Sequence, residues 1–311
     1  IPHFDTATER AAPGDTALSL ARGEGYLGFT RNGWPEALGV HITSGKPEQL
    51  IVLPQPTYLP LVTAIATAAV VLAILFKFYL LAILVTVVIA GLFIYGGQSA
   101  GHTRDYGPLP IGRGISVPPH TEVASTPPWM AMVCTLVADG TLFASLVFGT
   151  FYLWLAAPNW PSAVAFNPNR ILALGVLAGL VVAAMAARRA LRALVTGGKP
   201  QGWIALAMLS LVLAIAAVVG LIGGVIPHPR EHALGATAAA LLSYIAVHAG
   251  IGLLFLTSNL LRIRAGMVSA LRHTDLRLTR LWLAFTAVTG AIALALVLAL
   301  PSLVSIMGAQ A

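Results

Sequence analysis

The chain reads Trp129-Met-Ala-Met-Val-Cys-Thr-Leu-Val-Ala-Asp139-Gly-Thr-Leu-Phe-Ala-Ser-Leu-Val-Phe-Gly-Thr-Phe-Tyr152 in the stretch that decides its fold. This stretch is long and apolar enough for a bilayer-spanning helix, which needs about 20 such residues. Asp139 is the only carboxylate inside any of the long apolar runs of the sequence. Because a charge in hydrocarbon is costly, an acid there is neutral, paired or turned toward a polar interior, and it marks a functional site by default.

The composition extends this conclusion to the whole chain. Its 311 residues are 58% hydrophobic and only 9% charged, whereas soluble domains carry about 25% charged residues. The composition therefore indicates an integral membrane protein. A single cysteine, Cys134, excludes a disulfide within the chain and a cysteine metal cluster, and its apolar surroundings predict a small core residue. The sequence begins at Ile1 without a signal pattern, so we expect a mature or excised segment of a longer polypeptide.

The apolar runs predict an all-α membrane fold with seven transmembrane helices. The predicted spans are 58–76, 78–95, 129–156, 170–187, 203–226, 238–261 and 281–307. Only Lys77 and Phe78 separate the first two spans, which predicts a two-helix hairpin at 58–95, with one kinked element as the alternative. A Gly- and Pro-rich cytoplasmic connection at 96–128 then leads to a five-helix module at 129–307. Residues 1–57 are polar and predict a soluble cytoplasmic arm with short strands, for example at 49–53.

The basic residues predict the orientation of these helices. Of the 18 Lys and Arg residues, only Lys77, Arg170 and Arg230 fall on one side of the predicted spans, and the others fall on the opposite side. Because Lys and Arg are enriched in cytoplasmic loops, we expect a cytoplasmic N-terminus and an external C-terminus. The net charge of +7 is then a consequence of topology, and we expect no nucleic-acid partner.

Asp139 and His248 are the candidate functional residues within the spans. Asp139 lies about ten residues into its helix, near the middle of the membrane. It could relay protons or hold a lipid or a partner helix, or it could be a protonated acid that hydrogen-bonds to a nearby hydroxyl such as Thr135. His248 is the only histidine deep in a span, and Tyr244 lies one turn earlier on the same helix face. Because a metal centre needs several ligands, we interpret His248 as a satisfied interior histidine and predict no metal, cofactor or catalytic residue in this chain.

Two other motifs predict structure rather than chemistry. His228-Pro-Arg-Glu-His232 has the spacing of a metal site, but Pro229 places it in a loop, where the two imidazoles do not share a helix face. Gly175 and Gly179, like Gly220 and Gly224, are four residues apart. Such pairs of small residues let membrane helices approach closely, so we interpret them as packing positions.

The stretch from Trp129 to Tyr152 resembles the third helix of subunit III of haem-copper cytochrome oxidases. That family has a Trp near the helix start, then an acid, and then a stretch rich in aromatic and small residues that ends in Phe and Tyr. The matching residues are Trp129, Asp139, Leu142, Phe143, Ala144, Phe148, Phe151 and Tyr152. The family usually has Glu at the position of Asp139, so this chain carries a shorter acid there.

Other regions resemble the same family. Tyr244-Ile-Ala-Val-His248-Ala-Gly-Ile-Gly252 is similar to a family helix with a His shortly before a Gly-rich run. The last span keeps Trp282 but departs from the family's Trp-His-Phe-Val-Asp. The segments that begin at Ile1 and Arg31 look like the linker that follows the twelve-helix core of subunit I in bacterial oxidases with fused subunits I and III.

The resemblance implies the C-terminal part of a fused subunit I/III polypeptide in a bacterial plasma membrane. The chain would be a non-catalytic component of a proton-pumping cytochrome c oxidase, with haem and copper held by subunits I and II. Subunit III supports proton uptake, binds phospholipids and protects the enzyme from turnover inactivation. The implied site residues are Asp139, His248, Tyr244 and Trp129. An alternative is a secondary transporter or channel that uses Asp139 as the coupling acid, although transporters commonly show internal repeats, which this sequence lacks.

Overall fold

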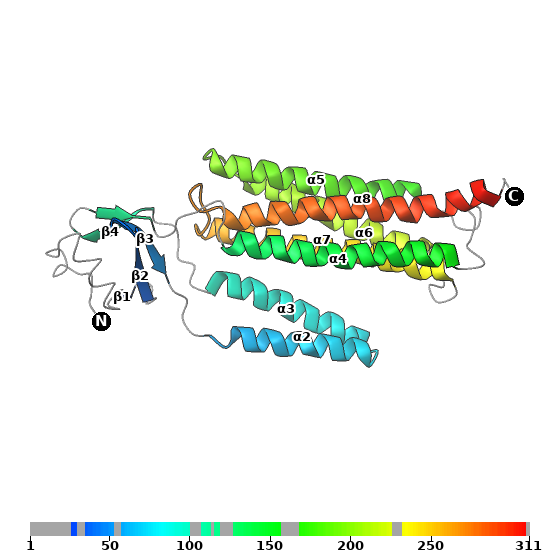
Figure 1. Cartoon of the computed structure of the whole chain (residues 1–311), viewed down its shortest axis with the longest axis horizontal. Helices are drawn as coiled ribbons and strands as arrows, with labels where there is room; N and C mark the ends of the chain where they lie inside the picture. Colours follow the sequence, from blue (N-terminus) through cyan, green and yellow to red (C-terminus); the bar gives the residue numbers. More distant parts are fainter. Residues whose placement is uncertain are drawn as a thin grey trace. The chain divides into compact units, whose positions relative to one another are not determined.

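The structure, a computed structural model, describes residues 26–29, 35–52, 57–99, 107–112, 115–118, 127–156, 168–225 and 232–308. The chain divides into two compact units. One unit falls within Ile1–Val123 and Leu261–Arg272, and the other within Ala124–Leu260 and His273–Ala311. Helices dominate both units, so the predicted class of an α-helical membrane protein is confirmed (Figure 1).

The first unit also contains five short strands. They are β1 (Tyr26–Phe29), β2 (Pro35–Val40), β3 (Pro47–Val52), β4 (Leu109–Gly112) and β5 (Ile115–Val117). The first three form an antiparallel sheet in the order β1-β2-β3, and β4 pairs with β5. The Leu50 N–H donates to the Pro118 carbonyl at 2.9 Å. Leu38, Leu50 and Val117 are buried together, so segments far apart in the sequence share one small core.

These strands amend the predicted organisation. The sequence predicts a strand at 49–53, and β3 covers this position up to Val52, while Leu53 lies outside the described residues. The segment 96–128, predicted only as a connection, contains β4 and β5. The sequence pattern does not reveal these two strands because each is short, and because β-propensity depends on the neighbours that a strand packs against.

Two antiparallel helices of the first unit meet at Lys77. They are α2 (Leu59–Leu75) and α3 (Tyr79–Ser99). Lys77 has a φ of 63°, a left-handed conformation that few non-glycine residues adopt. The Phe78 N–H donates to the Ala73 carbonyl at 2.7 Å, which ends α2 with a backbone hydrogen bond. The break between the two helices therefore lies at the Lys77–Phe78 pair that separates the apolar runs of the sequence.

Six helices are long and apolar enough to cross a membrane within the described part of the chain. They are α3, α4 (Pro127–Ala156), α5 (Arg170–Val195), α6 (Gln201–Val225), α7 (Ala233–Arg264) and α8 (Thr274–Gly308). The remaining predicted span, 58–76, corresponds to α2, which has only 17 residues and is not among these six helices. At about 1.5 Å per residue, α2 is somewhat shorter than a hydrocarbon core of about 30 Å.

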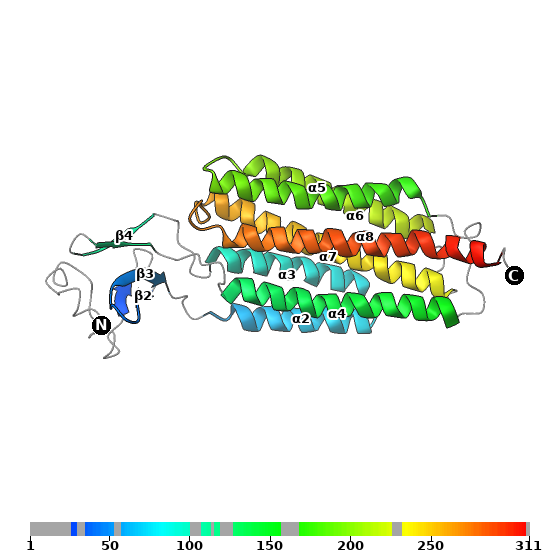
Figure 2. The same ribbon diagram turned by 45° about the horizontal axis from the view of Figure 1, so that its top comes forward.

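Helices α4 to α8 run side by side in the second unit (Figure 2). α5 packs against α6 and α8, and α4 packs against α8. The buried residues of α5 recur every three or four positions along one face, from Ala173 to Leu194, as expected for a helix with one side in a core. α4 differs, because Phe143 and Thr150 are its only buried residues. Cys134 of α4 is exposed, so its prediction as a core residue is wrong.

Only one glycine of the Gly175/Gly179 pair is in close contact with the neighbouring helix. A Cβ atom built on Gly179 would lie 2.8 Å from the Ser210 carbonyl oxygen and 2.9 Å from the Ala214 Cβ of α6. A Cβ atom on Gly175 would meet nothing within 4 Å. Gly179 therefore lets α5 and α6 approach closely, as small residues do in membrane proteins.

We predict that Gly179→Ala destabilises the protein and that Gly175→Ala does not. The added methyl group at residue 179 overpacks the α5–α6 contact, which typically costs about 1–3 kcal/mol. At residue 175 the methyl group enters open space, and replacing a glycine by alanine raises helix propensity. The free energy of unfolding of both variants in detergent measures the difference. Equal effects at the two positions would contradict the assigned contact.

Candidate functional site

Asp139 contacts two polar side chains of α7. Its Oδ2 atom accepts a hydrogen bond from the Tyr244 hydroxyl at 2.7 Å and lies 2.8 Å from the His248 Nε2 atom. The side chains of His248 and Asp139 are only 6% and 14% exposed. The intramembrane acid is therefore paired and largely buried between α4 and α7, as the cost of an isolated charge in hydrocarbon requires.

The other ring nitrogen of His248 identifies the protonation pattern. Nδ1 lies 2.8 Å from the backbone carbonyl oxygen of Tyr244, and because a carbonyl only accepts hydrogen bonds, Nδ1 must carry a proton. Nε2 then faces Asp139 in one of two ways. In the first, Nε2 of a neutral imidazole accepts a hydrogen bond from a neutral carboxyl group. In the second, Nε2–H of an imidazolium donates a hydrogen bond to a carboxylate. Both arrangements hold the same number of protons, so the pair has no net charge in either.

Aromatic rings enclose this polar pair. The Trp282 ring of α8 is stacked on His248 with a centroid distance of 5.2 Å and an interplanar angle of 4°. Its Nε1–H donates to the backbone carbonyl of His248 at 3.1 Å. On the other side, the Phe143 and Tyr244 ring centroids are 5.0 Å apart. The aromatic contacts hold the imidazole in one orientation and link three helices at one point.

The structure brings together three of the four predicted site residues. Asp139, Tyr244 and His248 form one cluster, whereas Trp129 lies about 15 Å along α4 from Asp139 at 1.5 Å per residue. There the Trp129 ring contacts the Arg277 guanidinium at 5.9 Å. Thr135, the predicted local partner of Asp139, instead donates to the Ala131 carbonyl at 2.9 Å. Asp139 thus takes its partners from another helix.

A second buried polar contact joins α7 and α8. The Asn259 Nδ2 group donates to the Thr279 hydroxyl at 2.8 Å, and these residues are only 3% and 2% exposed. Neither residue is among the sequence-based candidates. Asn259 follows Thr257 and Ser258 near the end of an apolar run, and an amide within a membrane helix is a signal that could have identified it, because such amides hydrogen-bond across helices.

Metal ligands do not cluster in the described residues. Among them, no group of three or more His, Cys, Asp or Glu side chains could hold a metal ion. His232 accepts a hydrogen bond from the Leu234 N–H at 3.1 Å through Nδ1 and so caps the start of α7. The other residues of its motif, 228–231, lie outside the described part of the chain.

The cluster is suited to holding one exchangeable proton. A single oxygen atom, Asp139 Oδ2, contacts both the phenol and the imidazole. A proton can pass between this oxygen and Nε2 without a change in net charge, because Nδ1 keeps its own proton on the Tyr244 carbonyl. The arrangement can therefore stabilise an acid in the membrane and can also take part in a hydrogen-bonded proton path.

Comparison of the sequence with protein-family models found no matching family. Comparison with the curated proteins found no matching relative.

We predict that Tyr244→Phe and Asp139→Asn have strongly non-additive effects on stability. An asparagine that donates its amide group to Nε2 presents a nitrogen without a lone pair to Tyr244. If the asparagine oxygen takes the place of Asp139 Oδ2 instead, it can accept from the Tyr244 hydroxyl, but it offers no proton for a hydrogen bond to His248 Nε2. Loss of the tyrosine hydroxyl should therefore cost about 0.5–1.5 kcal/mol in the wild type and almost nothing beside asparagine.

Unfolding free energies of the four proteins in detergent give the coupling energy of this double-mutant cycle. Ser145→Ala is a matched control on α4, because Ser145 is exposed and donates only to Thr141 of its own helix. Its effect should be the same with Asp139 or with asparagine. Additive effects of Tyr244→Phe and Asp139→Asn would show that the phenol and the carboxyl do not interact.

Proposed function

We propose that this chain is a non-catalytic membrane component of a haem-copper terminal oxidase, a subunit III or the subunit III part of a fused subunit I/III. One observation supports this proposal above others. Asp139 and His248 come from two separate helices in which the sequence resembles subunit III, and Trp282 is the residue that the last span keeps of the family's pattern. His248 contacts both of the other residues in the structure, so residues from three distant places in the sequence form a single cluster.

The proposed oxidase role divides the chemistry between subunits. Subunits I and II would hold haem and copper, reduce oxygen and pump protons, and this chain would support proton uptake, phospholipid binding and the stability of the complex. We place it in the bacterial plasma membrane with a cytoplasmic N-terminus and an external C-terminus, with α2 as a seventh, short span. The excess of Lys and Arg on one side of the spans supports this orientation.

Asp139 would act in this role by holding α4 in position. α4 buries only Phe143 and Thr150, so most of its apolar surface is exposed to lipid or to a partner subunit. The contacts of Asp139 with Tyr244 and His248 fix the rotation and height of α4 on α7. We propose that the surface of α4 that remains exposed faces subunit I, near the proton uptake path.

Isolation of the chain in a mild detergent tests the proposed assembly. We expect it to co-purify with a complex that shows haem absorption and consumes oxygen. A stand-alone oligomer that takes up a solute would instead favour the transporter, in which Asp139 is the coupling acid. Retention of the complex after a salt wash separates a true subunit from an adhering protein, because surface ion pairs weaken in salt.

We predict that Asp139→Asn shortens the turnover lifetime of the assembled oxidase several-fold while its initial oxygen consumption stays close to normal. Asp139 Oδ2 contacts both Tyr244 and His248, and no single atom of the amide can replace it in both contacts, so α4 is held less firmly. Oxygen consumption followed until inactivation measures the lifetime, and phosphate analysis of the purified complex measures its lipid content. Thr67→Ala of α2 is the control, because Thr67 is exposed and its hydroxyl donates to the Thr63 carbonyl of its own helix. Unchanged pumping, lipid content and lifetime in Asp139→Asn would refute the proposed role.

A further inference from the structure

A groove of about 370 Å³ follows the seam between α5 and α6. Gly175 and Val182 of α5 line it on one side, and Leu206, Leu213 and Ala217 of α6 on the other. Its polar lining residue is Ser210, whose hydroxyl donates to the Ala207 carbonyl of its own helix at 2.9 Å. The groove therefore offers an apolar surface without a hydrogen-bonding group that needs an outside partner.

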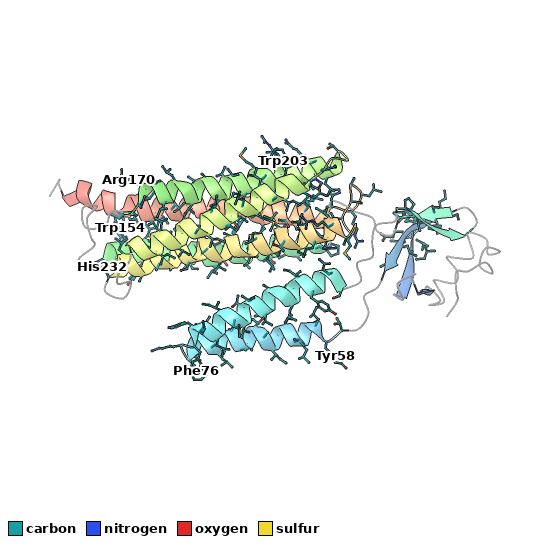
Figure 3. All side chains as sticks on the ribbon, turned by 180° about the vertical axis from the view of Figure 1, so that it is seen from behind. Tyr58, Phe76, Trp154, Arg170, Trp203 and His232 are labelled. Atoms are coloured by element: carbon teal, nitrogen blue, oxygen red, sulfur yellow. The ribbon has the colours of Figure 1, made fainter. Side chains whose placement is uncertain are left out.

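A cation and an aromatic ring lie beyond one end of this groove. The Arg189 guanidinium of α5 sits 5.0 Å from the ring centroid of Trp203 on α6. Arg189 follows Val182 by two helical turns, about 10 Å, and Trp203 precedes Leu206 by about 5 Å along its helix. Both therefore continue the faces that line the groove. Figure 3 shows Trp203 and Arg170 at opposite ends of the α5–α6 pair.

The charge at this end is not balanced by the two helices that carry it. Arg188 and Arg192 are exposed within one turn of Arg189 on α5, and Lys199 is exposed in the turn between α5 and α6. The sequence has no Asp or Glu between Asp139 and Glu231. Within the described residues, none of the three arginines forms an ion pair with a carboxylate. An exposed cluster of four cations next to an apolar groove matches an amphipathic anion.

We propose that this groove binds one acyl chain of an anionic phospholipid, with the lipid phosphate at Arg189. The distance from Trp203 to Leu213 along α6 is about 15 Å, which equals half of a hydrocarbon core of about 30 Å and so matches one leaflet. Basic pockets between membrane helices recognise anionic headgroups. The Arg189 guanidinium lies over the Trp203 ring and forms no ion pair with a carboxylate among the described residues, so its N–H groups can donate to phosphate oxygens.

The first test removes the cation. Arg189→Gln in the purified full chain, with any partners that co-purify, should weaken the binding of phosphatidylglycerol about fivefold, the effect expected for one cation near an anionic lipid. Native mass spectrometry with added phosphatidylglycerol or phosphatidylcholine counts the bound lipids. Arg170→Gln, an exposed arginine at the other end of α5, should leave both lipids unaffected. Equal loss of both lipids, or no loss, in Arg189→Gln overturns the proposal.

The second test fills the groove. Gly175→Leu adds a side chain where a Cβ meets nothing within 4 Å, so the helices should still pack while the acyl chain is displaced. Gly223→Leu is the control, because Gly223 is exposed on α6 outside the groove and also has open space at its Cβ. Loss of bound phosphatidylglycerol in Gly175→Leu alone supports the lipid site. Retention of the lipid together with loss of a partner protein would show that the groove holds a helix instead.

Discussion

A carboxyl group in the middle of a membrane must find its partners within the protein, and this constraint organises the five-helix unit. Asp139 meets it through Tyr244 and His248, both on α7. Those hydrogen bonds determine which face of α4 turns inward. Trp282 then extends the contact to α8 through its bond to the His248 carbonyl. A rotation of α4 would break the hydrogen bonds of Asp139 to Tyr244 and His248. The acid would then be left unpaired, because no water is present in the membrane to satisfy it.

Elsewhere the same unit depends on close approach rather than on polar contacts. Gly179 brings α5 against α6, and Gly290 of α8 leaves room for Leu180. Because lipid is as apolar as leucine, membrane helices gain little free energy from burying apolar side chains against one another. Their association is instead stabilised by the close packing of small residues. α4 has few such contacts, since it buries only Phe143 and Thr150. Its polar cluster therefore contributes more to its position than packing does.

Two surfaces of the five-helix unit thus have different properties. The cluster at Asp139 is enclosed by aromatic rings and holds its proton internally, which suits a structural support near a proton path. The α5–α6 seam is open, apolar and bordered by cations, which suits a lipid. Each feature stabilises an arrangement of helices in the membrane.

Hydrophobicity and charge are local properties of a stretch, so the sequence predicts the membrane class, the break at Lys77 and the presence of an acid within an apolar helix at Asp139. It also placed Tyr244 and His248 on one face, since residues four apart in a helix are neighbours. The tertiary structure alone decided that Asp139 meets them, that Asn259 meets Thr279, that Cys134 is exposed and that β3 meets β5. Contacts between elements depend on helix rotation and height, which many packing interactions set together and which no single spacing encodes.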